Sequence, residues 1–177
     1  MTTNITTDKY LRCWRAGGTM RWSCNYFMRH CGDNVHAHSA RVTNLLLQLW
    51  GYDIPSHVLI TALTHDDGEC LVGDAPYGSK TPDHAARENK ARHDIWEHIG
   101  TLPPTTNEWR DRISICDGID HVLMAQHHAP HLLREQSWLK ARTRLLNAAQ
   151  DQSWGVYQEV RMIIGEPGDT IATDDML

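Results

Sequence analysis

A histidine and an aspartate stand side by side at the end of an apolar run. The run ends at residue 64, and His65-Asp66 follow it directly. Two further carboxylates come soon after, at Glu69 and Asp74. Such a cluster at the end of an apolar segment is hard to explain as packing alone. Neutral imidazole and carboxylate are ligands of divalent metals, so the cluster indicates a metal site if the rest of the chain supplies the missing ligands.

A helix before this cluster supplies a further histidine. It is predicted over residues 33–50, with N-cap residue types at its start and Gly51 directly after its end. Its apolar stripe consists of Val42, Leu45, Leu46 and Leu49. His38 precedes that stripe by four residues and shares its face, whereas His36 lies about 200° away around the helix. The helical phase therefore selects His38 over His36 as the buried, potentially metal-ligating histidine.

The remaining chain also has helical periodicity. A short helix is predicted at residues 10–14, and longer ones at 53–66, 81–99, 105–128 and 131–164. Thr105 and Glu108 match a capping box, and Thr81-Pro82 match an N-cap and first helical position. No run of alternating strands is present. We therefore predict an all-α fold that forms a single domain over residues 1–177, with residues 1–8 and 166–177 flexible.

Two of these helices have inward faces that can be named in advance. In the helix over residues 53–66, the apolar positions predicted to face inward are Val58, Leu59, Ala62 and Leu63. In the charged helix over residues 81–99, Trp96 and Ile99 are expected to face inward. The His65-Asp66 pair thus follows a segment that we expect to pack against the core.

The helix predicted to begin at Thr105 carries an aspartate at an inward position. Trp109, Ile113 and Asp117 follow one another at intervals of four residues, so Asp117 falls on a stripe that we expect to be buried. His38, His65, Asp66 and Asp117 together would complete a divalent-metal site between helices. The alternative is that these buried side chains only satisfy one another by hydrogen bonds.

Composition excludes several classes of function. The formal net charge of −5 argues against binding to DNA or RNA, which usually needs a basic face. The five cysteines contain no C-x-x-C pair, so a disulfide framework or a cysteine zinc site is not expected. No uncharged apolar run reaches membrane-spanning length, and no apolar leader begins the chain. We expect a cytoplasmic protein without a membrane partner.

The ordered set of a separate His, an adjacent His-Asp pair and a later Asp resembles the HD superfamily of metal-dependent phosphohydrolases. The resemblance covers nearly the whole chain and implies a compact HD-domain helical bundle. A narrower likeness joins Arg21-Trp22, His65-Asp66-x-x-Glu69 and Gly73-Asp74-x-Pro76-x-x-Ser79-Lys80. These segments are similar to the 5′-deoxynucleotidase branch and to compact dATP triphosphohydrolases of phages that replace adenine with 2-aminoadenine.

The resemblance implies a role for each matching residue. His38, His65, Asp66 and Asp117 would bind the metal, and Glu69 and Asp74 would be catalytic carboxylates or, together, part of a second metal site. Arg21 and Lys80 would bind phosphates, and Trp22 would pack on the deoxyribose. Relatives usually place a Lys three residues before the last Asp. Ser114 stands there in this chain, and Arg112 is the candidate substitute.

The family implies a metal-dependent deoxynucleoside triphosphate triphosphohydrolase. It would prefer dATP and release deoxynucleoside and triphosphate after attack of activated water on the α-phosphorus, to deplete dATP in a phage with modified adenine. In that case the host cytoplasm is its location. A 5′-deoxynucleotidase acting on monophosphates and a non-catalytic nucleotide-binding domain are the alternatives. The expected cofactor is zinc, cobalt, manganese or a similar ion, with additional divalent ions on the triphosphate, and relatives imply a homo-oligomer.

Overall fold

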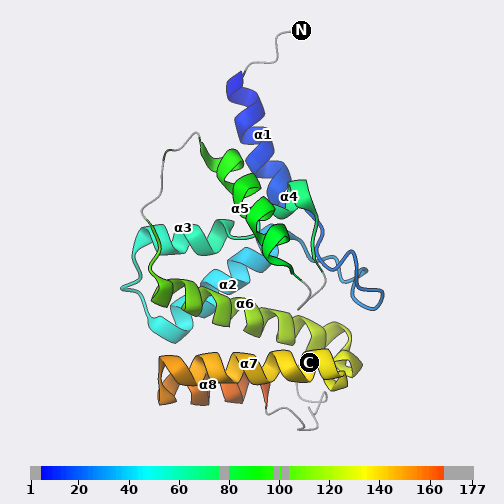
Figure 1. Ribbon diagram of the computed structural model, residues 1–177, viewed down its shortest axis with the longest axis vertical. Coiled ribbons are helices and arrows are strands. Elements are labelled where there is room, and N and C mark those ends of the chain that lie inside the picture. The colour runs from blue at the N-terminus through cyan, green and yellow to red at the C-terminus, as the bar shows by residue number, and fades with distance from the viewer. Residues whose placement is uncertain (1–4, 76–79, 98–99, 101–103, 166–177) are drawn as a thin grey trace. The chain divides into compact units, whose positions relative to one another are not determined.

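The protein is built from helices (Figure 1). The computed structural model describes residues 5–75, 80–97, 100 and 104–165, with the backbone alone for residues 5–10. Within these ranges the only β-structure is one isolated bridge, between Met20 and Asn34. The all-α prediction is therefore confirmed. None of the described helices is long and apolar enough to cross a membrane.

The chain divides into two compact units, which are described separately below. Unit 1 comprises residues 1–41 and 55–105, and unit 2 comprises residues 42–54 and 106–177. Helix α2 (Val35–Trp50) contributes its first part to unit 1 and the rest to unit 2. The prediction that residues 1–177 form a single domain stays a prediction.

Unit 1 contains α1 (Ile5–Gly17), α3 (Ser56–Thr64), α4 (Glu69–Val72) and α5 (Pro82–Trp96). Helices α4 and α5 pack against each other, and both contact α1 (Figure 1). The turn before α4 lies very close to α5, because a Cβ added at Gly68 would come 2.2 Å from the backbone oxygen of Glu88. Only glycine permits this approach, which brings the His65-Asp66 turn against α5.

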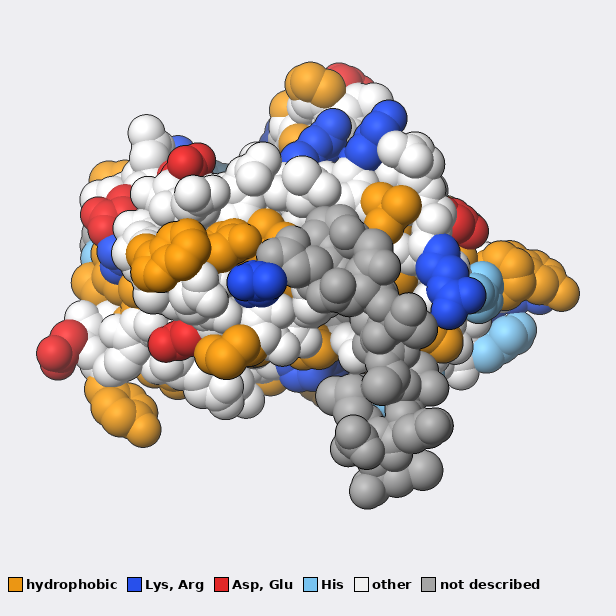
Figure 2. All heavy atoms as spheres, turned by 90° about the horizontal axis from the view of Figure 1, so that it is seen from below, with side chains coloured by type: hydrophobic (Ala, Val, Ile, Leu, Met, Phe, Trp, Pro, Cys, Tyr) orange, Lys and Arg blue, Asp and Glu red, His pale blue; other side chains and the backbone are white. Residues whose placement is uncertain are grey.

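Unit 2 contains α6 (Asn107–His128), the 3₁₀ helix η2 (Pro130–Arg134), α7 (Gln136–Gln152) and α8 (Trp154–Ile164). Helices α6, α7 and α8 pack on one another around apolar side chains, and η2 packs on α6 and α7. Gly118 lets α6 approach α7, because a Cβ there would lie 3.1 Å from the side chain of Leu145. Trp154 and Met162 of α8 stay largely exposed. Figure 2 shows that hydrophobic side chains are interspersed with polar ones on the face it draws.

Several helix ends follow the sequence signals. The Asn34 side chain accepts a hydrogen bond from the Ala37 N–H at the start of α2, at 2.9 Å. Gly51 follows the end of that helix with a positive φ of 80°, which glycine adopts without strain. The Thr81 side chain caps α5 by accepting from the His84 N–H, at 3.2 Å. These caps confirm the predicted starts of α2 and α5.

Other details correct the sequence interpretation. The capping residue of α6 is Thr106 rather than Thr105, whose buried hydroxyl lies 3.0 Å from that of Thr61 instead. Leu63, predicted to face inward, is 43% exposed, and Thr64 is buried in its place. Helix α1 begins at Ile5, so it is longer than the predicted segment 10–14 and includes part of the range predicted to be flexible.

Two further predictions concern the chain ends and the last helical region. That region divides at Ser153, whose hydroxyl accepts from the Val156 N–H and caps α8. The predicted inward position of Ile99 and the predicted flexibility of residues 1–4 and 166–177 lie outside the described residues.

Candidate metal centre

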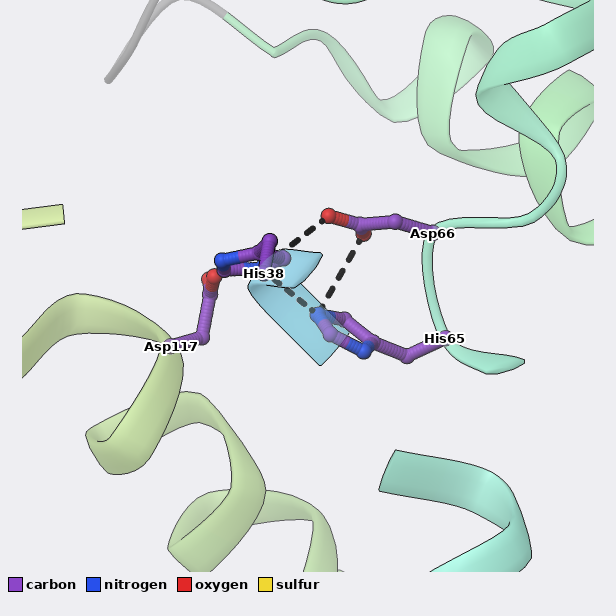
Figure 3. Close-up of side chains that lie close together, drawn as sticks. All are labelled: His38, His65, Asp66 and Asp117. Carbon is purple, nitrogen blue, oxygen red and sulfur yellow. Dashed lines mark hydrogen bonds and ion pairs between the residues drawn. The ribbon is translucent and has the colours of Figure 1, made fainter. Parts of the chain in front are cut away.

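The turn between α3 and α4 holds two of the four candidate ligands, His65 and Asp66. Helix α3 ends at Thr64, and a tight turn over residues 65–68 leads into α4. The Glu69 N–H donates to the backbone oxygen of Asp66 at 2.9 Å, which fixes the turn. His38 comes from the first turns of α2, within unit 1. Figure 3 shows the side chains of His38, His65 and Asp66 directed toward one another.

The spacing of the three donors fits one divalent cation. The Nε2 atoms of His38 and His65 lie 3.2 Å apart. Asp66 places Oδ2 at 3.4 Å from the His38 nitrogen and Oδ1 at 3.5 Å from the His65 nitrogen. Ligand atoms about 2.0–2.2 Å from a metal, at tetrahedral or octahedral angles, lie about 3–3.5 Å from one another. The donor atoms and their separations therefore suit a metal, and a buried His/Asp cluster that can hold one is present.

A contact with the backbone determines which ring nitrogen of His65 carries the proton. Its Nδ1 lies 2.7 Å from the backbone oxygen of Ala62, one turn earlier in α3. A ring nitrogen facing a carbonyl carries the proton, so the other nitrogen, Nε2, keeps its lone pair for a cation. The helical-phase prediction for α2 is confirmed, because His38 is fully buried while the His36 side chain is 53% exposed.

Asp117 belongs to unit 2 and is labelled in Figure 3. It lies on α6, where its side chain is 32% exposed and its Oδ1 is 3.1 Å from Nδ1 of His121. The buried carboxylate of this helix is Asp120, three residues on, which is 3% exposed. Asp117 was predicted to lie on the buried face of this helix, but its side chain is partly exposed, and Asp120 is the more deeply buried of the two. A role for Asp117 as a metal ligand stays a prediction.

Arg21 lies inside unit 1 rather than on its surface. It is 3% exposed, and its Nη1 is 2.5 Å from Oδ2 of Asp66, one of the candidate ligand atoms. Its Nε is 3.7 Å from Asp33, and Arg41 pairs with the same Asp33 carboxylate at 2.9 Å. The guanidinium therefore orients the Asp66 carboxylate in this structure. The resemblance implies that the same guanidinium binds a phosphate, which stays a prediction.

Trp22 and Asp74 are held together by a direct hydrogen bond. The Trp22 N–H donates to Oδ2 of Asp74 at 2.6 Å, and its indole N–H donates to Asp33 at 3.3 Å. Trp22 has a φ of 63°, the only positive value among described residues other than glycine. A bulky residue in this region is strained, and such strain is retained where surrounding contacts fix the backbone. Trp22 is 5% exposed.

Glu69 is buried beside this cluster, and its pKa lies far above the usual value for a glutamate. Burial, followed by the negative charge of Asp66, raises the pKa of Glu69 to about 9, and the nearby Arg21 opposes the shift. Glu69 is 4% exposed, and its Oε2 is buried without a hydrogen-bond partner. Without a bound cation the carboxyl group therefore holds its proton at neutral pH.

Two buried carboxylates close to the cluster were missed by the sequence interpretation. Glu88 of α5 is 5% exposed, and its Oε2 pairs with the Lys80 ammonium at 2.6 Å. Asp67 is fully buried, accepts from the Trp96 indole at 2.7 Å, and has its pKa raised by burial. Glu88 could have been found by helical phase, since it precedes the buried Ala91 by three residues on the same face. Asp67 lies in a turn, so helical periodicity could not have predicted its burial.

His93, His127, His128 and His131 are exposed. All five cysteines are free thiols. Arg112, the candidate substitute for the missing lysine, pairs with Glu108 and with Gln152 inside unit 2. His98 lies outside the described residues.

Comparison of the chain with models of known families, with curated proteins and with solved structures finds no match.

Proposed function

We propose that this protein is a metal-dependent hydrolase of deoxynucleotide phosphates, and specifically a triphosphohydrolase that takes dATP. The observation that carries the proposal is the buried set of His38, His65 and Asp66 with ligand-like spacing, beside an unpartnered Glu69 oxygen. Hydrogen bonds among these side chains are the structural alternative, and the unpartnered Glu69 oxygen beside them favours a cation over that alternative. The match of Arg21-Trp22, Asp74 and Lys80 to the deoxynucleotidase motifs narrows the substrate class.

The residues around the site have complementary roles in this proposal. A divalent cation bound there would lower the pKa of a water molecule toward neutrality and polarise a phosphoryl oxygen. Asp66 is kept in a ligating orientation by Arg21, and His65 by its contact with Ala62. Glu69, once it has lost its own proton, accepts a proton from the attacking water as a general base. Asp117 is proposed as the fourth metal ligand.

Substrate phosphates require positive charge, which Lys80 supplies best. Its side chain is 40% exposed and reaches the buried Glu88, so the ammonium stands where solvent meets the acidic cluster. Burial lowers the pKa of Lys80, but its hydrogen bond to Glu88 and the negative charges nearby outweigh this effect and raise the pKa, so the amine stays charged. Arg21 is already paired with Asp66, so in this proposal it contributes positive charge to the phosphate site as part of that pair. Trp22 packs on the sugar and excludes a 2′-hydroxyl.

A 5′-deoxynucleotidase acting on monophosphates is the nearest alternative, because the same attack on the same phosphorus serves both reactions. A nucleotide-binding domain without turnover is the second. Glu69 favours catalysis over binding alone in this proposal, because a buried carboxylate beside a bound metal can act as a general base toward water. The preference for adenine rests on the motif resemblance.

Hydrolysis of the four dNTPs, ATP and the dNMPs, with each divalent metal added in turn, tests the proposal. We expect dATP to be consumed fastest, with triphosphate and deoxyadenosine formed in equal amounts. Consumption of dAMP alone, with release of inorganic phosphate, would replace the triphosphohydrolase by the nucleotidase. Absence of turnover with every metal, in protein shown to bind metal, would leave only the binding role.

A further inference from the structure

A second set of buried carboxylates adjoins the His/Asp cluster. Asp66, Glu69 and Glu88 each present an oxygen, and these oxygens all lie within 4.8 Å of one another. Their exposed fractions are 7%, 4% and 5%. All three come from unit 1. Three carboxyl groups so close and so poorly hydrated repel one another when ionised, and such a group persists only where protons or cations compensate it.

The protein's own cations compensate only part of this set. Arg21 pairs with Asp66, and Lys80 pairs with Glu88. The third member is different, because Oε2 of Glu69 is buried without any hydrogen-bond partner. An unpartnered carboxyl oxygen costs free energy unless a ligand uses it. Since this oxygen belongs to a set of carboxylates, the ligand that suits it is a cation.

The packing of two helices holds the set together. Glu69 and Glu88 reach it from α4 and α5, which pack against each other. The close approach of Gly68 to the backbone of Glu88 fixes the separation of these helices, because no side chain fits between them at that point. The packing of the backbone therefore keeps the three carboxyl groups close, although their negative charges repel one another.

We propose that Asp66, Glu69 and Glu88 bind a second divalent cation, with Asp66 shared between this ion and the one held by His38 and His65. The ligands here are oxygens alone, which suit the hard cations Mg²⁺ and Mn²⁺, whereas the imidazole-containing site suits zinc and similar ions. Asp74 does not belong to this set of three carboxylates. Its carboxylate accepts a hydrogen bond from the backbone N–H of Trp22. The two sites therefore differ in the metal that they select.

Lys80 occupies part of this second site in the structure. Its ammonium lies 2.6 Å from Oε2 of Glu88, on a carboxylate that the cation would use. Binding of the cation displaces the ammonium, which then becomes available to a substrate phosphate. Only this last step rests on the proposed function, since the binding of the cation itself requires no substrate.

Titration of the zinc-saturated protein with Mn²⁺, followed by electron paramagnetic resonance, tests the second site. We expect one Mn²⁺ to bind per chain in addition to the zinc. The Glu88→Gln variant should bind Mn²⁺ at least about tenfold more weakly and keep its zinc, because loss of a metal-binding group commonly costs that much affinity. Glu97→Gln, an exposed change at the end of the same helix, is the matched control and should bind Mn²⁺ like the unmodified protein.

The same titration of Lys80→Gln tests the competition. Removal of the ammonium should strengthen Mn²⁺ binding several-fold, and circular dichroism of every variant confirms that it folds. The proposal is overturned if the zinc-saturated protein binds no Mn²⁺, or if Glu88→Gln binds it as tightly as the Glu97→Gln control. A protein that binds both metals but hydrolyses no nucleotide would refute the proposed function and leave the second site standing.

Discussion

The two units bury very different side chains. Unit 1 buries a set of polar and charged residues around its turn at residues 65–68, namely Arg21, Asp33, His38, Ser39, Thr64, Asp66, Asp67, Glu69, Glu88 and Thr105. In unit 2 the corresponding residues are only Thr43, Asp120 and Arg142 among the described side chains. The buried side chains of unit 2 are otherwise apolar, and they come mainly from α6, α7 and α8.

The candidate metal-binding side chains that are buried lie in unit 1, whereas the buried side chains of unit 2 are mostly apolar and stabilise its fold. Burying apolar surface stabilises a fold, whereas burying carboxylates and imidazoles costs free energy unless they are paired or bind a ligand. Unit 1 therefore buries groups that contribute less to the stability of the fold than apolar side chains would, unless they are paired or bind a ligand. Unit 2 resembles an ordinary helical core, in which Arg142 is held by a hydrogen bond to the Ile164 carbonyl at 2.8 Å. Variants in the two units should therefore fail in different ways.

The largest effect is expected for Asp66→Ala in unit 1. Both proposed cations lose a ligand, so bound metal should disappear and hydrolysis should fall by about a thousandfold or more, since a metal contributes several kcal/mol to such a reaction. Metal content by mass spectrometry and dATP turnover measure this. Asp66→Asn keeps a polar partner for the buried Arg21 and checks that the loss does not reflect misfolding. Unchanged hydrolysis in either variant contradicts the metal assignment.

The next effect is expected for Leu146→Ala in unit 2. Leu146 is 4% exposed in the apolar core, and truncating it should lower the free energy of unfolding by about 2–5 kcal/mol. Denaturant unfolding measures the loss. Metal affinity of the folded variant should not change, because no candidate ligand of unit 1 is altered. A Leu146→Ala protein that unfolds normally but loses its metal would break the separation between the units.

A smaller effect, on pH dependence, is expected from Glu69. In metal-free protein the pKa of this group is raised from 4.5 to about 9, so the folded state keeps a proton that the unfolded state has lost between those values. The free energy of unfolding should therefore fall as pH rises through this window. Glu69→Gln should flatten the fall and slow hydrolysis by about a hundredfold. Unfolding curves at several pH values test this, and equal slopes in both proteins would argue against it.

The smallest effect is expected for Trp22→Ala. Loss of the indole should weaken discrimination between dATP and ATP by about tenfold, because the space for a 2′-hydroxyl opens while the metal ligands remain. The ratio of kcat/KM values for the two nucleotides measures it. Trp96→Ala, which removes an indole contact with the buried Asp67 elsewhere in unit 1, is the control. If selectivity is equal in all three proteins, Trp22 does not contact the sugar.

Helical periodicity predicted α2, α3, α5 and α6, but not the full length of α1, the short α4, or the division of residues 131–164 into η2, α7 and α8. It also predicted the burial of His38, because one inward face determines which of two nearby histidines is enclosed. It could have indicated the burial of Glu88, which shares a helix face with Ala91, but not the contacts that Glu88 and the turn at residues 65–68 make with each other. Those contacts depend on α5 packing against a turn distant in sequence, and Gly68 alone did not reveal that contact. Arg21 shows a related limit, since its type predicted a cation but its pairing with Asp66 depends on tertiary structure. The roles of Arg21, Trp22, Asp74, Lys80 and Asp117 stay predictions.

Remetallation of the metal-free protein tests the central claim, a metal-dependent hydrolase, most directly. Zinc, cobalt or manganese is added stepwise, and bound metal and the rate of dATP hydrolysis are measured on the same samples. We expect the metal-free protein to be inactive and activity to rise in proportion to the metal bound at His38, His65 and Asp66. Hydrolysis at full rate without bound metal, or bound metal that restores no hydrolysis of any deoxynucleotide, would contradict that claim.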